Sequence, residues 1–360
     1  MASLTLDHLR RYAIARTLFS PTSLGRALIK LGFVQADPIR APARAQDLTL
    51  RQRVKNYRAG DLERRYTQLG IEEDFFVNYG FLPRANYALM HPRGERRPWD
   101  RRTRRRAAEL RAYIAEQGAV HPRQVDEHFS HGSVTNYWGG SSNASTHLLD
   151  GMHYRGQLRV VRRDNGIRIY GLSEHGPAPR GAAALARLDA LIDVIVQLYA
   201  PLPALSLSGL VSRLRWGTPQ WTDRLRPALQ RAKARLAHAR VDAVEWYWPA
   251  GEQPDSARHA RDERVRLLAP FDPLVWDRRR FELLWGWAYR FEAYTPAAKR
   301  KLGYYALPLL WQDEVIGWGN LSWREGQLDA RLGFVRERPR QPAFERELEA
   351  ELARIKLFLA

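Results

Sequence analysis

The chain has 360 residues, of which 45% are hydrophobic and 11% aromatic, so a sizeable core is expected and disorder is not. Its 58 Lys and Arg outnumber its 39 Asp and Glu and leave a net charge of +19, which indicates a polyanionic partner, although GC-rich codon usage can also inflate arginine. The absence of cysteine excludes disulfides and thiolate metal sites, and the absence of a long apolar run excludes a membrane-spanning helix, so we expect a cytoplasmic protein.

The N-terminal segment predicts two helices and a short strand. Apolar residues recur at helical spacing from position 4 to 13, and a second helix is expected over 23–31. Gly32 is placed to end this helix as its C-cap. Residues 33–37 then form an extended piece that Pro38 stops.

Arginines are concentrated between Arg93 and Arg106, where eight of them stand against Glu95 and Asp100. Two interpretations stay open for this run. It is either a solvated linker that leads into a helix, or a surface patch that follows phosphates.

The next segment predicts three helices followed by a β-hairpin. The helices are expected over 105–117, 121–129 and 143–150, with Ser141 or Ser142 as N-cap of the third, and the strands over 157–163 and 167–171. Asn165-Gly166 between the strands favours a tight hairpin turn. This order is typical of a winged helix-turn-helix, in which the third helix enters the major groove and the hairpin forms the wing.

A related pattern follows and suggests an internal structural repeat. It consists of helices over 182–199, 206–216 and 219–239 and of strands over 241–248 and 264–268.

The last part of the chain predicts a small antiparallel sheet or barrel closed by a helix. Its strands are expected over 304–310, 315–323 and 328–335, and its helix over 343–359.

Gln35 and Asp37 are the pair of side chains to which we assign chemistry. They lie two positions apart on the extended piece, so both are expected to face the same side. An amide beside a carboxylate can hold and activate one water, and the carboxylate can stabilise an oxocarbenium-like sugar. The alternative is that Asp37 only caps the turn before Pro38. No metal or nucleotide motif is present, so we expect neither a metal nor another cofactor.

Four segments carry a resemblance to a known family. They are LGFVQADPI (31–39), FLPRANY (81–87), APFDPLVWDRRR (269–280) and YRFEAYTPAAKRKLGYY (289–305). With them the chain resembles the crosslink-repair DNA glycosylases, the AlkZ/YcaQ-like winged-helix family, over nearly its whole length. The family motif is Gln, an apolar residue, then Gln or Asp, so Gln35-Ala36-Asp37 is similar to the Asp-bearing, YcaQ/AlkX-like branch.

The resemblance implies an α+β fold with tandem winged helix-turn-helix motifs in a C-shaped arrangement and a small C-terminal antiparallel β-barrel. The expected parts are residues 1–92 with the Gln-x-Asp motif, 93–175 as a central winged helix, 176–268 as a third winged-helix-like part, and 269–360 as the barrel with its closing helix. We expect a monomer, because no heptad or apolar stripe demands a dimer.

The resemblance also implies a monofunctional DNA glycosylase of base excision repair, located at the nucleoid. Its partner would be double-stranded DNA with alkylated or crosslinked purines, and it would hydrolyse the N-glycosidic bond of N7-alkylated purines and unhook N7-linked interstrand crosslinks. Asp37 would stabilise the sugar cation and help to activate water, while Gln35 would orient the water or the sugar. The alternatives are a non-catalytic winged-helix regulator or lesion sensor, and an interaction module for another protein.

One segment departs from the family pattern. Where members of this branch often have Trp-Ala-His-Glu-Ala, this chain has Phe75 to Tyr79 without the His and the Glu. Either the substrate scope or rate is altered, or the missing pair only shapes the cleft.

Nine residues are candidates for DNA contact. They are Arg44, Arg84, Asn143, Thr146, His147, Arg162, Arg163, Lys299 and Arg300. Structural ion pairs are the alternative for Arg44 and Arg84, and a solvated loop is the alternative for Lys299 and Arg300. On the proposed recognition helix, contacts with the DNA backbone are expected rather than base reading, because a repair enzyme must tolerate any sequence.

Overall fold

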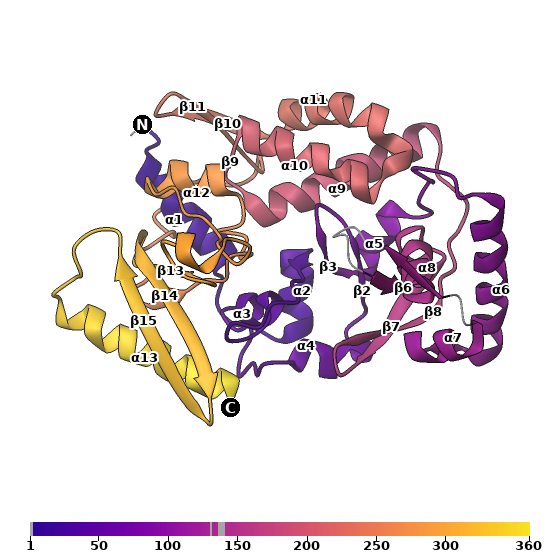
Figure 1. Cartoon of the computed structure of the whole chain (residues 1–360). Coiled ribbons are helices and arrows are strands. Elements are labelled where there is room, and N and C mark those ends of the chain that lie inside the picture. Colours follow the sequence, from indigo (N-terminus) through magenta and orange to yellow (C-terminus); the bar gives the residue numbers. More distant parts are fainter. Residues whose placement is uncertain (1–2, 130–131, 136–140) are drawn as a thin grey trace. The chain divides into compact units, whose positions relative to one another are not determined.

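A computed structural model describes residues 3–129, 132–135 and 141–360 and divides the chain into two compact units (Figure 1). The first unit comprises the N-terminal residues to Leu62, Ile192–Val211 and Leu229–Ala360, and the second comprises Glu63–Leu191 and Ser212–Ala228. In both units the β-hairpins are antiparallel, which confirms the expected mixture of helices and antiparallel sheets. The four-part division and the C shape stay predictions.

The first unit begins with the predicted helices. Helix α1 (Leu6–Thr17) is capped by Thr5, whose side chain accepts from the backbone N–H of His8. Helix α2 (Leu24–Leu31) ends at Gly32, whose φ of +70° lies in the left-handed region that favours glycine. The regular strand β1 covers only Val34–Gln35, shorter than predicted, and α3 (Ala45–Leu50) follows.

The middle of the chain contains three α-helices, a 3-10 helix and a three-stranded sheet. The elements are α9 (Gly181–Tyr199), β9 (Leu202–Pro203), α10 (Ala204–Gly217), the 3-10 helix η2 (Pro219–Arg224), α11 (Leu225–Arg235), β10 (Ala237–Val241) and β11 (Val244–Trp248). The predicted helix over 219–239 is therefore wrong at its end, because residues 237–241 pair with β11. Asp242 and Ala243 form the turn, with φ of +48° and +62°.

The C-terminal sheet corrects a second expectation. Its order is β12 (Val265–Leu267), β13 (Leu307–Trp311), β14 (Glu314–Arg324) and β15 (Gln327–Phe334). The predicted strand over 264–268 is β12, and it pairs with β13 rather than completing a second wing. Helix α13 (Pro342–Leu359) packs against β12 and β15 (Figure 1). Closure of this sheet into a barrel is not confirmed.

Buried ion pairs join distant segments of the first unit. The guanidinium of Arg53 contacts both carboxylate oxygens of Asp272 at 2.7 and 2.9 Å, and neither side chain is exposed. Asp272 precedes α12 (Arg278–Trp285), a helix capped by Asp277. Arg53 also donates to the carbonyls of Thr17 in α1 and Thr49 in α3, so it attaches these helices to the segment that precedes α12.

The second unit contains a hairpin, helices and a three-stranded sheet. Its further elements are α4 (Asp61–Arg64, at the boundary), the 3-10 helix η1 (Tyr66–Gln68), β2 (Ile71–Phe75), β3 (Tyr79–Pro83), α5 (Arg84–Met90), α6 (Arg101–Gln117), β4 (Ala119–Val120), α7 (Pro122–Phe129), β5 (Ser133–Thr135), β6 (Ser141–Asn143), α8 (Ala144–Tyr154), β7 (Leu158–Asp164) and β8 (Ile167–Leu172). Strand order in the larger sheet is β4-β8-β7.

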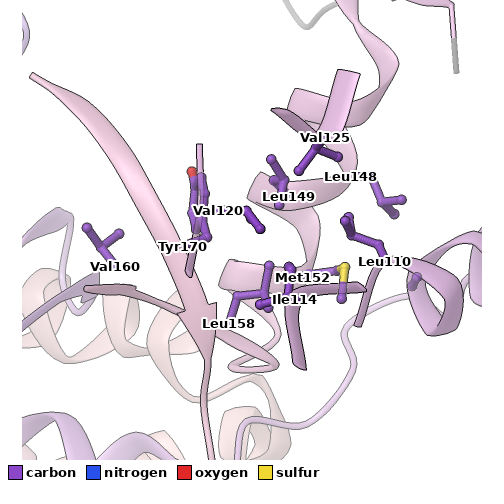
Figure 2. Close-up of a cluster of buried hydrophobic side chains, with 11 residues drawn as sticks. Leu110, Ile114, Val120, Val125, Leu148, Leu149, Met152, Leu158, Val160 and Tyr170 are labelled. Atoms are coloured by element: carbon purple, nitrogen blue, oxygen red, sulfur yellow. The ribbon is translucent and has the colours of Figure 1, made fainter. Parts of the chain in front are cut away.

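Helices α6, α7 and α8 enclose an apolar core with the β7–β8 hairpin, in the predicted element order. Leu110, Leu149 and Tyr170 belong to this cluster (Figure 2). Helix α6 begins at Arg101, earlier than predicted, because the side chain of Asp100 accepts from the N–H of Thr103. Asn165 and Gly166 adopt φ of +52° and +86°, which confirms the hairpin turn. Naming this part a winged helix stays a prediction.

The start of α8 corrects the predicted N-cap. The cap is Asn143, whose side chain accepts from the N–H of Ser145, rather than Ser141 or Ser142. The reason is one of register, since Asn143 directly precedes the first helical residue.

Candidate active site

Gln35 and Asp37 lie beside α3 in the first unit. Asp37 is half-buried, and its carboxylate Oδ1 accepts from the N–H of Ile39 at 2.9 Å. Its own N–H donates to Oε1 of the buried Gln46 at 3.3 Å. The turn-capping role that the sequence allowed for Asp37 is therefore real, but it uses only one oxygen. In the described part of the chain, Oδ2 accepts no hydrogen bond.

Gln35 brings an unused acceptor to the same segment. Its side chain is 7% exposed, and its Oε1 is buried with no hydrogen-bond partner among the described residues. A buried carbonyl oxygen without a donor is uncommon in folded proteins and often marks a place for a water or a ligand.

Two tyrosines interact electrostatically with Asp37. Burial raises the pKa of the Asp37 carboxyl, and the bond from Ile39 opposes this rise. Burial and then the negative charge of Asp37 raise the pKa of Tyr305 and that of Tyr294. Tyr305 is 2% exposed whereas Tyr294 is 75% exposed, so Asp37 interacts with one buried and one open aromatic side chain.

An aromatic cluster holds these tyrosines in place. The ring of Phe291 meets that of Tyr305 edge-on with centroids 5.2 Å apart, and it meets those of Tyr294 and Phe271 at 6.0 and 5.1 Å. Carboxylate Oε2 of Glu292 accepts from two backbone N–H groups of residues 301 and 302, and so fixes the loop between them. The site thus draws on the three motif segments 31–39, 269–280 and 289–305.

Sequence reasoning missed Tyr294 and Tyr305. Both lie in a segment that carries the family resemblance, and this was the available signal. Nothing in the local pattern indicates that this segment meets Gln35 and Asp37, which lie far away along the chain.

Three predicted DNA contacts belong to the first unit. Arg44 is half-buried and stands at the N-cap position of α3. Lys299 is exposed at the end of the 3-10 helix η3 (Ala297–Lys299). Arg300 donates from Nε to the carbonyl of Thr295 at 2.7 Å, and its guanidinium lies 5.0 Å from the ring centroid of Tyr304.

The arginines of the second unit differ in their surroundings. Arg84 pairs with Glu72 at 3.0 Å, which is the ion pair that the sequence left open. Arg163 pairs with the buried Glu73 at 2.5 Å, and its side chain is only 11% exposed. Arg162 by contrast is exposed and bonds Asp164 at 3.1 Å on the same hairpin.

The predicted recognition-helix residues lie at the start of α8. The side chain of Asn143 is engaged by the N–H of Ser145 and by Asp126. Thr146 is half-buried and His147 is exposed. His147 also lines a cavity of about 730 Å³ together with Trp99, Arg106, Arg155 and Arg168. Of the predicted residues on this helix, His147 is therefore the one most open to a partner.

The departing segment forms the turn of the β2–β3 hairpin. Phe75 packs edge-on against Tyr79 and Tyr154, with centroids 5.0 and 5.5 Å apart. The positions where the family branch often has His and Glu hold the buried Val77 and the half-buried Asn78, and the side chain of Asn78 accepts from the N–H of Tyr79.

The described residues contain neither a candidate membrane-spanning helix nor a candidate metal-binding cluster. Across 3–129, 132–135 and 141–360, no helix has the length and apolar character needed to cross a membrane. Within the same ranges, no group of three or more His, Asp or Glu is arranged to hold a metal ion.

Comparison with known proteins gives a family match and a structural match. Residues 28–358 match the model of a family described as DNA glycosylase AlkZ-like. The structure is similar to that of the DNA glycosylase AlkZ of Streptomyces sahachiroi, with a TM-score of 0.63 at 16% sequence identity, over 99% of this chain and 97% of that chain. At this identity the structural likeness shows a shared fold.

Proposed function

This chain belongs to the AlkZ-like DNA glycosylase family, which confirms the resemblance of its sequence segments, and from that premise we propose that it hydrolyses the N-glycosidic bond of N7-alkylated purines. Membership in this family makes it a DNA glycosylase and DNA its substrate. The observation that supports the finer proposal concerns Asp37 and Gln35, two positions apart. Within the described part of the chain, one carboxylate oxygen of the half-buried Asp37 and the buried amide oxygen of Gln35 accept no hydrogen bond.

The proposed reaction needs little assistance at the base. Alkylation at N7 gives the purine a positive charge, so the bond between C1′ and N9 breaks with its electron pair passing to the purine, which leaves neutral. The sugar cation forms next to the ionised Asp37, which stabilises it. Water oxygen then bonds to C1′ and its proton passes to Asp37, with Gln35 orienting the water.

We extend the proposal to N7-linked interstrand crosslinks and to a monofunctional reaction that leaves an abasic site. A Schiff-base lyase needs a free amine near the sugar. Lys30 is the lysine nearest to Gln35 along the chain, and its ammonium lies 4.1 Å from the ring centroid of Phe19. This contact supports a structural role for Lys30.

We also propose where the DNA backbone is contacted. The exposed His147 and Arg162, with Lys299, Arg300 and Arg44, supply side chains for phosphates. Asn143 and Thr146 would contribute from the start of α8. Arg84 and Arg163 are already paired with carboxylates, which weakens the case for them.

The test is release of 7-methylguanine, and of one arm of an N7-linked crosslink, from duplex DNA by the purified protein. We expect Asp37→Asn to lower the single-turnover rate by about 100-fold or more. Asp262→Asn is the matched control, because Asp262 is a partly exposed carboxylate that pairs with Arg266. Equal release by Asp37→Asn and wild type would remove Asp37 from the mechanism.

The alternative is a non-catalytic regulator or lesion sensor. It would be favoured if the protein bound one DNA sequence tightly and released no base.

A further inference from the structure

The hydroxyl of Tyr305 has no visible structural use. The side chain is 2% exposed, and its hydroxyl oxygen is buried without a hydrogen-bond partner among the described residues. Buried hydroxyls are nearly always paired, so an unpaired one needs an explanation. A core position that required only an aromatic ring would be filled by phenylalanine at no such cost.

Tyr305 is held rigidly and in its protonated form. Phe291 packs edge-on against its ring. Burial and the charges of Asp37, Tyr289 and Tyr294 all raise the pKa of the hydroxyl, and Arg278 alone opposes them. The phenol therefore keeps its proton at neutral pH and presents a hydrogen-bond donor.

Three polar atoms around this segment have no hydrogen-bond partner among the described residues. The hydroxyl of Tyr305, which interacts electrostatically with Asp37, offers a donor, while Oδ2 of Asp37 and Oε1 of Gln35 offer acceptors. A water molecule has two hydrogens and two lone pairs. Two acceptors and one donor leave it a single lone pair, which is the requirement for a nucleophile.

We propose that Tyr305 is a positioning residue, whose hydroxyl donates a hydrogen bond to the attacking water while Asp37 and Gln35 each accept a hydrogen bond from that water. This inference rests on the proposed glycosylase function and deepens it. The donated bond directs the remaining lone pair toward C1′ and polarises the water toward Asp37. Tyr305 does not touch the sugar and acts only through the water.

Tyr289 provides the matched control. It is as buried as Tyr305, at 2% exposed, and its ring likewise packs against a phenylalanine, Phe281, with centroids 5.7 Å apart. Its hydroxyl, however, donates to the carbonyl of Ala306 at 2.6 Å. The same Tyr→Phe change therefore removes a hydroxyl that makes a hydrogen bond at Tyr289 and a hydroxyl that makes none with the described residues at Tyr305.

The experiment measures single-turnover release of 7-methylguanine, DNA affinity and thermal unfolding for Tyr305→Phe and Tyr289→Phe. We expect Tyr305→Phe to lower the rate at saturating protein by about tenfold to 100-fold, with DNA affinity unchanged and Tm equal or higher. Tyr289→Phe should lower Tm and leave the rate unchanged. An unchanged rate in Tyr305→Phe would overturn the inference.

The pH profile gives a readout that a structural role would not move. The donor stabilises ionised Asp37 through the water, so its loss raises the pKa of Asp37 and moves the acidic limb of the rate profile to higher pH. The other groups that face this pair, Tyr294, Tyr289 and Arg278, keep their charge state over that pH range. An acidic limb at the same pH in both proteins would contradict the proposal.

Failure of this inference differs from failure of the proposed function. If wild type releases the base, Asp37→Asn does not, and Tyr305→Phe matches wild type in rate and pH profile, only the role of Tyr305 is wrong. If the wild-type protein releases no base, the proposed function and the role of Tyr305 that rests on it both fail.

Discussion

At the scale of single residues, Asp37 combines a structural and a chemical role. Its Oδ1 closes the turn with Ile39, and this bond aims the carboxylate. Burial raises its pKa, which means that the folded protein disfavours the ionised form. A group whose ionisation opposes folding is retained at a functional site rather than for stability.

This yields a prediction on stability. Because the pKa of Asp37 is higher in the folded state, its contribution to stability is present at low pH and is lost as pH rises through the folded pKa. We expect Asp37→Asn to raise Tm at pH 7, since the amide oxygen can still accept from Ile39 without the buried charge. Thermal unfolding of both proteins measures this, and the gain should shrink in acid. A lower Tm at pH 7 would show that the carboxylate stabilises the fold.

Tyr294 supports a second prediction at this scale. Its ring is 75% exposed next to Asp37, and an N7-alkylated purine is a cation. An aromatic face attracts a cation by about 0.5–2 kcal/mol. We therefore expect Tyr294→Ala to weaken binding of duplexes with 7-methylguanine by that amount and Tyr294→Phe to keep most of the affinity. Equal losses on undamaged duplex would show that Tyr294 contacts DNA without regard to the lesion.

At the scale of elements, local signals in the sequence predicted where helices end and hairpins turn, but they did not predict which strands pair over long distances in the chain. Gly32 and Asn165-Gly166 could be predicted because these residue types tolerate a left-handed backbone. The structure has positive φ angles at these positions, where the helix end and the hairpin turn were expected. Strand β12 was predicted at the right place but with the wrong partner, because β13 lies about forty residues further along. The relation of Asp37 to Tyr305 was not predictable for the same reason.

The β10–β11 turn was missed because its residues are unusual, and this gives a prediction. Ala243 has a φ of +62°, a region that disfavours residues with a Cβ atom. We expect Ala243→Gly to stabilise the protein by about 1 kcal/mol. Ala239→Gly within β10 is the control and should destabilise it. Urea unfolding measures both, and a loss of stability for Ala243→Gly would mean that the methyl group packs favourably.

At the scale of the whole molecule, the net charge of +19 is divided between paired and open side chains. Charge alone does not identify the DNA-binding residues, since arginines such as Arg163 hold the fold together through Glu73. Binding to phosphates releases counterions, and the affinity then falls with salt in proportion to the number of contacts. Salt dependence can therefore separate the two kinds of arginine.

The prediction contrasts three substitutions on undamaged duplex. Arg162→Gln and Lys299→Gln should each reduce the slope of log K against log[salt] by about 0.9 while leaving Tm unchanged, because each would remove one phosphate contact. Arg163→Gln should leave the slope unchanged and lower Tm, because it removes the closer cation of the buried carboxylate of Glu73 and leaves only Arg168, at 3.9 Å. Filter binding over a salt series, paired with thermal unfolding, measures both quantities. A reduced slope with an unchanged Tm in Arg163→Gln would mean that Glu73 releases this arginine to the DNA.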